Sequence, residues 1–252
     1  MRIKDLVAIV TGGGSGFGEG ICVAYADQGA KLVVADINRE HGERVATALR
    51  ANGKQAVFCQ ADVSQSADMK NLVDTALEQY GRLDIMVNNA GISHPNQPML
   101  NVTEEQFDRI FAVNVKSIYL SAIHCVPHFR KQGSGSFINV ASTAAIRPRP
   151  GLVWYSGSKG AVTTLTKAMA IELAADKIRV NAINPVMGET ALLTTFMGME
   201  DTPENRARFV STIPLGRMSR PSDIANAALF FADPASELVT GVCMEVDGGR
   251  CI

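Results

Sequence analysis

Short β-branched runs alternate with longer amphipathic stretches along almost the whole chain, and this rhythm restricts the possible folds more than any other feature. Several of the short runs are apolar on both faces, which is typical of strands buried between two layers of helices. We predict strands over residues 7–11, 31–36, 55–60, 83–88, 136–141, 179–184 and 243–246. We predict helices over residues 17–28, 39–51, 65–79, 103–131, 152–174 and 221–232. This alternation predicts an α/β fold with a doubly wound parallel sheet and right-handed crossovers.

Length and composition favour one ordinary globular domain, residues 1–252, with no repeat or linker to divide it. The 24 basic and 25 acidic side chains nearly cancel, so there is no electrostatic reason to expect nucleic acid or an anionic membrane as partner. No apolar run approaches the ~18 residues of a membrane span. The five scattered cysteines form no CxxC pair, which argues against disulfides and a metal site and favours a reducing, cytoplasmic location.

A glycine-rich segment, TGGGSGFG at residues 11–18, lies between the first predicted strand and the first predicted helix. Its glycines fit the spacing Gly-x-x-x-Gly-x-Gly at Gly12, Gly16 and Gly18. A tight turn of this kind lets backbone N–H groups approach a pyrophosphate at the start of a helix. Glycine-rich turns also serve chain geometry alone, but the position directly after the first strand favours nucleotide binding.

Asp36 ends the second predicted strand and indicates which nucleotide is bound. A carboxylate there can accept hydrogen bonds from both ribose hydroxyls of an adenosine and would repel a 2′-phosphate. The alternative is an ordinary aspartate at a strand end. The segment 12–18 contains no Lys or Arg, and Arg39 is expected at an exposed helix start, so the sequence favours NAD over NADP.

Tyr155 and Lys159 are four residues apart, so on a helix they lie on one face, one turn from each other. A nearby ammonium favours the phenolate, so we expect the pKa of Tyr155 to lie below its usual value of about 10. Ser142 closes the preceding strand, at the edge where open α/β sheets bind ligands, and its hydroxyl can donate to a substrate oxygen. Alone, the pair would be a surface tyrosine and a solvated lysine; beside Ser142 and the glycine loop, it predicts catalysis.

In its motifs and their order, the chain resembles the short-chain dehydrogenase/reductase family over essentially its whole length. The resemblance is carried by TGGGSGFG at 11–18, NNAG at 88–91, Asn114, Ser142, Tyr155-x-x-x-Lys159 and VDGG at 246–249. It implies a Rossmann-type sheet of seven strands in the order 3-2-1-4-5-6-7 and nicotinamide chemistry. It also implies a homotetramer packed through the two long helices that follow strands four and five.

The resemblance further implies a role for each site residue. Tyr155 would be the general acid/base, Lys159 would also hold the nicotinamide ribose, Ser142 would orient the substrate, and Asn114 would keep a proton-relaying water. The implied cofactor contacts are Gly12, Ser15, Gly16, Phe17, Gly18, Asp36, Ile37, Asp62, Val63, Asn88, Ala90, Gly91, Tyr155, Lys159, Pro185 and Thr190. The family pattern Pro-Gly-x-x-x-Thr departs here at Val186, which replaces the glycine and leaves the geometry of that loop open.

Residues 187–217 interrupt the alternation, because they contain no strand signal and carry a cluster of apolar side chains: Leu192, Leu193, Phe196, Met197, Met199 and Phe209. Following the sixth strand, the segment is predicted to be a helical substrate lid; the alternative is a helical excursion that only covers core. Arg147 and Arg149, between Ser142 and Tyr155, belong either to an anion-binding loop or to a plain exposed turn.

We therefore expect an NAD-dependent oxidoreductase that interconverts a secondary alcohol and a ketone. A 3-oxoacyl-thioester reductase is the alternative enzyme, and Asp36 argues against it because the reductases of that type that resemble this chain usually take NADPH. A non-catalytic NAD sensor is a third possibility. It has no need of the acid/base pair, so the set Asn114, Ser142, Tyr155 and Lys159 argues against it.

Overall fold

The computed structural model describes residues 1–190 and 193–252 and forms one seven-stranded sheet of order β3-β2-β1-β4-β5-β6-β7. All neighbouring strands are parallel, so the predicted architecture is confirmed. The strands, each within two residues of its predicted bounds, are β1 (Val7–Thr11), β2 (Lys31–Asp36), β3 (Ala56–Gln60), β4 (Ile85–Asn88), β5 (Gly135–Val140), β6 (Ile178–Pro185) and β7 (Cys243–Val246).

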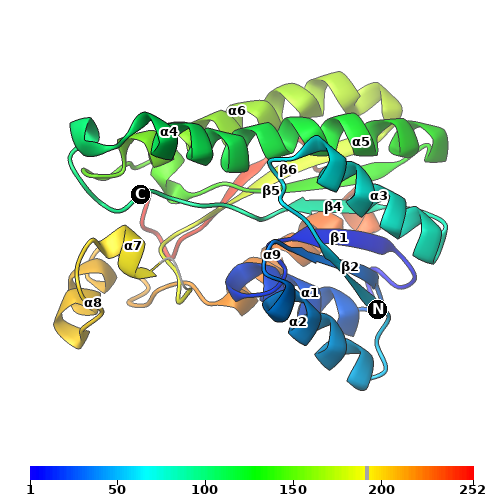
Figure 1. Ribbon diagram of the computed structural model, residues 1–252, viewed down its shortest axis with the longest axis horizontal. Helices are drawn as coiled ribbons and strands as arrows, with labels where there is room; N and C mark the ends of the chain where they lie inside the picture. The colour runs from blue at the N-terminus through cyan, green and yellow to red at the C-terminus, as the bar shows by residue number, and fades with distance from the viewer. Residues whose placement is uncertain (191–192) are drawn as a thin grey trace.

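Helices cover both faces of the sheet (Figure 1). One layer holds α1 (Gly16–Asp27), α2 (Arg39–Ala51) and α9 (Pro221–Ala232); the other holds α3 (Ser66–Tyr80), α4 (Glu104–Phe111), α5 (Ser117–Gln132) and α6 (Val153–Leu173). Residues of β1 alternate between the two cores, with Ala8 and Val10 in the first and Val7 and Ile9 in the second. A strand apolar on both faces therefore reports a sheet buried on both sides.

The helix expected over 103–131 contains an irregularity that the sequence did not show. It begins with a capping box, in which the Thr103 side chain accepts from the backbone of Gln106, and continues as α4. A π-helical turn, Ala112–Lys116, then joins α4 to α5. Single π turns inside helices are frequent at functional sites, and this one carries Asn114.

The helical run Glu104–Gln132 is long and apolar enough to cross a membrane, judged by length and composition only. Its apolar side chains have another explanation in this fold. Leu120, Cys125 and Phe129 are buried in the core between α5 and the sheet. The run therefore has the hydropathy expected of a core helix.

The segment between β6 and α9 forms two short helices, α7 (Leu193–Met197) and α8 (Pro203–Val210), which stand apart from the two layers (Figure 1). Leu193, Met197 and Met218 form a small core of their own, with Phe209 packed against it. Met199 is exposed, and Leu192 lies outside the described residues. The remaining short 3-10 helices are Met99–Asn101, Thr143–Ala145, Ala174–Asp176 and Pro234–Ser236.

Candidate active site

A cavity of about 390 Å³ opens at the carboxyl ends of the strands, where an open α/β sheet places its ligands. Most of the predicted site residues line it: Gly12, Ser15, Gly16, Phe17, Asp36, Ile37, Asp62, Val63, Ala90, Gly91, Ser142, Tyr155, Lys159, Pro185 and Thr190. Val186, the departure from the family pattern, is buried and lines it too. Three predicted residues lie behind the lining instead: Gly18, Asn88 and Asn114.

The glycine loop has the geometry of a cradle. Gly12 and Gly16 adopt left-handed backbone conformations, with φ of 62° and 53°. A side chain at Gly18 would place its Cβ 2.0 Å from the carbonyl oxygen of Gly12, so Gly18 allows α1 to pack against the loop. Asn89, which the sequence analysis did not single out, donates from its amide to the carbonyls of Thr11 and Gly12. Its place in the NNAG motif is the feature of the sequence that could have identified Asn89 as part of the site.

Asn88 points away from the groove that it was expected to line. Its side chain is buried, and its amide donates to the Asn139 side chain on the neighbouring strand at 2.9 Å. Asn89, one residue further, lines the cavity in its place. Successive side chains of a strand point to opposite faces, so the strand end can present only one of the two asparagines.

Asp36 lines the cavity with a carboxylate that is already oriented. It accepts hydrogen bonds from the backbone N–H groups of Gly14 and Asn38, both at 2.9 Å. A basic side chain, Arg44, also reaches the glycine loop, where it donates to the carbonyl of Gly14. Its charge is balanced by Glu19, which it pairs with at 2.8 Å.

Asp62 is the second carboxylate of this end of the cavity. Burial opposes its ionisation, but hydrogen bonds from Ser64 and the charge of Arg109 together hold its pKa below the usual value. Arg109 lies 3.9 Å from the carboxylate and lines the cavity as well. This end of the lining therefore presents oriented carboxylates and turn N–H groups, which suit a ribose and a pyrophosphate.

Tyr155 is buried, with 6% of its surface exposed, and its ring lies against that of Phe196 with the centroids 5.0 Å apart. Burial raises the pKa of Tyr155 to about 12, although a hydrogen bond with Ser142 and the charge of Arg149 oppose the rise. The prediction that Lys159 lowers the pKa of Tyr155 is therefore wrong when only the protein's own groups act on it, because removal of the phenol from water outweighs the nearby charges.

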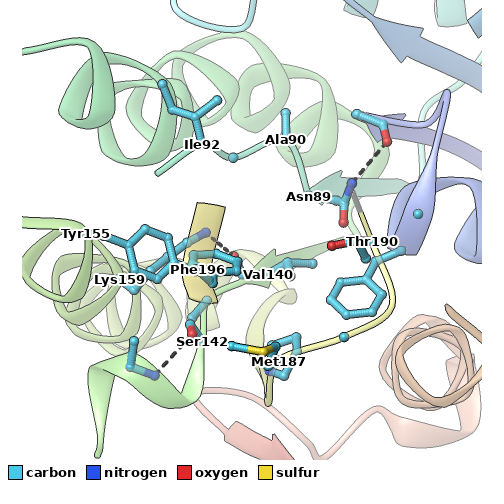
Figure 2. A pocket seen from close by; sticks show the side chains of 18 of the residues that line it. Asn89, Ala90, Ile92, Val140, Ser142, Tyr155, Lys159, Met187, Thr190 and Phe196 are labelled. Atoms are coloured by element: carbon cyan, nitrogen blue, oxygen red, sulfur yellow. Dashed lines mark hydrogen bonds between the residues drawn. The ribbon is translucent and has the colours of Figure 1, made fainter. Parts of the chain in front are cut away.

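Lys159 lies on the same face of α6 as Tyr155, with its ammonium 5.9 Å from the centre of the tyrosine ring. It donates to the carbonyl of Val140 at 2.8 Å, and burial lowers its pKa to about 8. Figure 2 shows Tyr155, Lys159, Ser142 and Phe196 gathered at one side of the cavity. A lysine with this pKa can exchange a proton near neutral pH.

Asn114 stands behind Lys159. Its side chain accepts from the backbone N–H of Ile92 and donates to the Ile92 carbonyl and the Ser158 hydroxyl. A Cβ at Gly91 would meet the Lys159 ammonium at 3.2 Å and the Asn114 carbonyl oxygen at 3.3 Å, so both groups converge on this glycine. The π turn brings Asn114 into this position.

Ser142 caps the short helix Thr143–Ala145, where its oxygen accepts from the backbone N–H of Ala144 at 3.1 Å. An oxygen that already accepts this bond leaves its own proton for a neighbouring oxygen. Within the described parts of the chain, no group of three His, Cys, Asp or Glu side chains is placed to hold a metal ion. Ser142, Tyr155 and Lys159 supply the hydroxyl, phenol and ammonium protons of the site.

The lid segment and the last turn of the chain complete the cavity opposite the strands. Phe196 of α7 and Phe209 of α8 line it, as do Thr212 and Ile213. Arg147 and Arg149 line it too, together with Arg250, which the sequence analysis missed. No local pattern marks Arg250, since it becomes a neighbour of the 147–149 loop only when β7 joins the sheet.

Comparison with known proteins places this site in a family. A family model described as Enoyl-(Acyl carrier protein) reductase matches residues 12–250. The chain belongs to the short-chain dehydrogenase/reductase family. The resemblance drawn from its motifs is thereby confirmed.

Relatives match over the whole length. A 4-formylbenzenesulfonate dehydrogenase of Comamonas testosteroni is 53% identical over 252 residues, which cover 100% of both chains. A cyclopentanol dehydrogenase of Comamonas sp. (strain NCIMB 9872) is 35% identical over 98% of both. The crystal structure of a 3-ketoacyl-(acyl-carrier-protein) reductase from Brucella melitensis, complexed with NADH, is 47% identical; it superposes with a TM-score of 0.93 over 99% of this chain and 100% of its own. The protein is therefore an oxidoreductase.

Proposed function

We propose that the protein is an NAD-dependent dehydrogenase that interconverts an alcohol and its carbonyl compound, with a secondary alcohol and a ketone as the expected pair. The proposal rests on one observation above all. Tyr155, Ser142 and Lys159 converge at one side of a cavity whose other side carries the oriented carboxylate of Asp36. When bound there, the nicotinamide would accept the hydride from the carbinol carbon, and the hydroxyl proton would pass to the protein.

The geometry supports a role for each protein group in this reaction. The Ser142 hydroxyl would orient the substrate oxygen, and Tyr155 would take the hydroxyl proton as a phenolate. Burial alone opposes that phenolate, so the positive charge of an oxidised nicotinamide bound beside the ring would be needed to favour it. Lys159, with its pKa lowered to about 8 by burial, would pass that proton on. Asn114 would hold the relay through its contacts with Ile92 and Ser158. In carbonyl reduction the same groups return the proton to the substrate oxygen.

The proposed preference for NAD is supported by the charges beside Asp36. Gly14 and Asn38 hold the carboxylate at the cavity wall, where it can accept from the ribose hydroxyls. A 2′-phosphate would lie against this negative charge. The basic side chain that reaches the loop, Arg44, is engaged by Glu19. The similar reductase from Brucella melitensis was crystallised with NADH, which agrees with this assignment.

A 3-oxoacyl-thioester reductase is the second candidate, and it is supported by the name of that same structure. The dehydrogenases among the relatives favour the first candidate, an alcohol dehydrogenase, instead. Their names include a cyclic secondary alcohol and a benzene ring that bears a formyl group, so aromatic primary alcohols belong in any substrate test. A non-catalytic sensor remains the third, and disfavoured, function.

We also propose a homotetramer in the cytoplasm. Tyr119 and Ile123 on α5 and Ile171 on α6 are exposed apolar side chains, at 59%, 51% and 82%, on the two helices that the family uses for packing. All five cysteines are free, which suits a reducing compartment. Light scattering of the purified protein would test the oligomeric state.

A substrate panel tests the proposed function. Reduction of NAD would be followed with aliphatic, cyclic and benzylic alcohols, and oxidation of NADH and NADPH with an acetoacetyl thioester. We expect turnover of at least one alcohol class with NAD. Turnover confined to the thioester would establish the second candidate. Tight NADH binding without turnover of any member would point to the sensor.

A further inference from the structure

The substrate side of the cavity concentrates positive charge. Arg147, Arg149 and Arg250 line this side, from the loop before α6 and the turn after β7. Asp36 and Asp62 are the carboxylates among the described lining residues, and both belong to the far, adenosine side. The cavity is therefore polarised: both acids lie at one end, where Arg109 pairs with Asp62, and the other end carries guanidinium groups without a carboxylate in the part of the lining that the structure describes.

These guanidinium groups lack acidic partners. Among residues 1–190 and 193–252, ten ion pairs are formed and none includes Arg147, Arg149 or Arg250. Arg147 donates to the backbone carbonyl of Arg250 and so ties the two segments together. One terminal nitrogen of Arg250, Nη1, is buried without a hydrogen-bond partner among the described residues.

Arg149 is half-buried and lies over the ring of Phe209, with its guanidinium carbon 4.8 Å from the ring centre. Burial and the repulsion of Arg250 both lower the pKa of Arg149. A guanidinium stays charged even so, because its ordinary pKa is far above neutral. Two like charges held near each other in a half-buried site repel, and an anion bound to both would relieve that repulsion.

The surroundings indicate the shape of that anion. The rings of Tyr155 and Phe196 lie 5.0 Å apart, and Phe209 supports Arg149 from the lid. These side chains add apolar and aromatic surface to a lining that also holds the Tyr155 phenol and the guanidinium groups. A planar fork of N–H donors matches the paired oxygens of a carboxylate or sulfonate.

We propose that Arg149 and Arg250 bind an anionic group, a carboxylate or a sulfonate, at the end of the substrate opposite its reacting hydroxyl. The substrate class is then a hydroxylated, preferably aromatic, organic anion. This inference rests on the proposed function for the word substrate, but the anion site itself does not depend on turnover.

A binding experiment tests the site without catalysis. Benzoate and benzenesulfonate would be titrated calorimetrically into the NADH-saturated protein. We expect at least one of them to bind, and binding to weaken by roughly 10- to 100-fold in Arg149→Gln and Arg250→Gln, the usual worth of a charge-assisted pair. Arg208→Gln is the matched control: it removes the same charge from an exposed position on α8 outside the cavity lining.

A kinetic experiment then compares matched alcohols. The substrates are 1-phenylethanol and benzyl alcohol, each with and without a para carboxylate or sulfonate. We expect kcat/KM to favour the anionic member over its neutral counterpart, and this ratio, measured within each variant, to fall toward unity in Arg149→Gln and Arg250→Gln.

The outcomes separate the two proposals. Arginine-dependent binding of benzenesulfonate without oxidation of any alcohol would uphold the anion site and defeat the proposed function. Oxidation with no preference for the anionic member, or equal losses on both members in the two variants, would overturn the anion site. If Arg208→Gln weakens binding as much as Arg149→Gln does, the effect reflects only the net charge of the protein, and the anion site is overturned as well.

Discussion

The two ends of the cavity are built in different ways. At the adenosine end, the glycine loop and Asp36 lie directly after β1 and β2, and short backbone hydrogen bonds hold them. At the substrate end, Arg149, Phe209 and Arg250 come from three separate segments; Arg149 lies over the Phe209 ring, and Arg250 accepts from Arg147 through its backbone carbonyl. The first end is a product of adjacent strand–turn–helix units; the second exists only because distant parts of the chain meet.

This difference suits the division of labour in such an enzyme. A cofactor common to many proteins can be held by an invariant strand edge, whereas a particular substrate needs a surface that can vary without disturbing the sheet. Tyr155 and Lys159 lie where the two ends meet. Substitutions at the junction formed by Tyr155 and Lys159, at the adenosine end and in the lid segment between β6 and α9 test this difference.

The largest effect is expected at the junction. Tyr155→Phe removes the hydroxyl and keeps the ring against Phe196, so folding and NAD binding should survive. Turnover should fall by about 10²–10⁴-fold, the usual contribution of a positioned acid or base. Tyr119→Phe, which removes the same atom on α5 outside the cavity lining, should leave turnover unchanged. Retention of more than a tenth of the activity in Tyr155→Phe, with chemistry rate-limiting, would remove the tyrosine from the mechanism.

The pH dependence tests the proton relay at the same junction. The pKa of Lys159 is lowered to about 8 by burial, so at a lower pH the lysine holds its own proton and cannot accept the one released from the alcohol. Alcohol oxidation should therefore slow by up to about tenfold for each pH unit below that value. Carbonyl reduction consumes a proton and should instead slow as the pH rises above that value. The profile of kcat/KM in Lys159→Arg should lose this limb, because a guanidinium stays protonated. An unchanged limb in that variant would assign it to another group.

At the adenosine end, Asp36 should impose at least a tenfold preference for NAD over NADP in kcat/KM, because the carboxylate opposes a phosphate dianion. Asp36→Ala should weaken NAD and bring the ratio toward unity. Asp74→Ala, an exposed carboxylate on α3, serves as control and should leave the ratio alone. Equal or better turnover of the unmodified enzyme with NADP would contradict the assignment.

The smallest effect is expected in the lid. Phe196→Ala removes the ring that packs on Tyr155 and should change KM between substrates by about fivefold, while NAD affinity stays nearly constant. Phe230→Ala makes the same truncation on α9 at a partly exposed position outside the cavity lining, and it should not reorder the substrates. A substrate ranking that survives Phe196→Ala would place the specificity pocket elsewhere.

The parts predicted from the sequence are those encoded in short windows. The strand pattern and the glycine loop depend on residues close together in the chain. Positions such as Asn88 were less predictable, because a one-residue shift at the end of a strand exchanges the face that a side chain occupies. The π turn at Asn114 left no composition signal either, since it depends on how α4 and α5 pack.

What the sequence determined by itself is the parallel, doubly wound sheet and the cofactor-facing turn, because periodicity and turn chemistry act locally. The strand order was implied by the resemblance of the motifs to a known family, and the structure confirms it. Only the tertiary structure decided the electrostatics of the catalytic end. Burial beneath Phe196 raises the pKa of Tyr155 to about 12, and burial lowers that of Lys159 to about 8. The fold also brings Arg250 close to Arg149, although the two residues are 101 positions apart in the chain. Desolvation and Coulomb interactions depend on distance through space, which the folded chain alone sets.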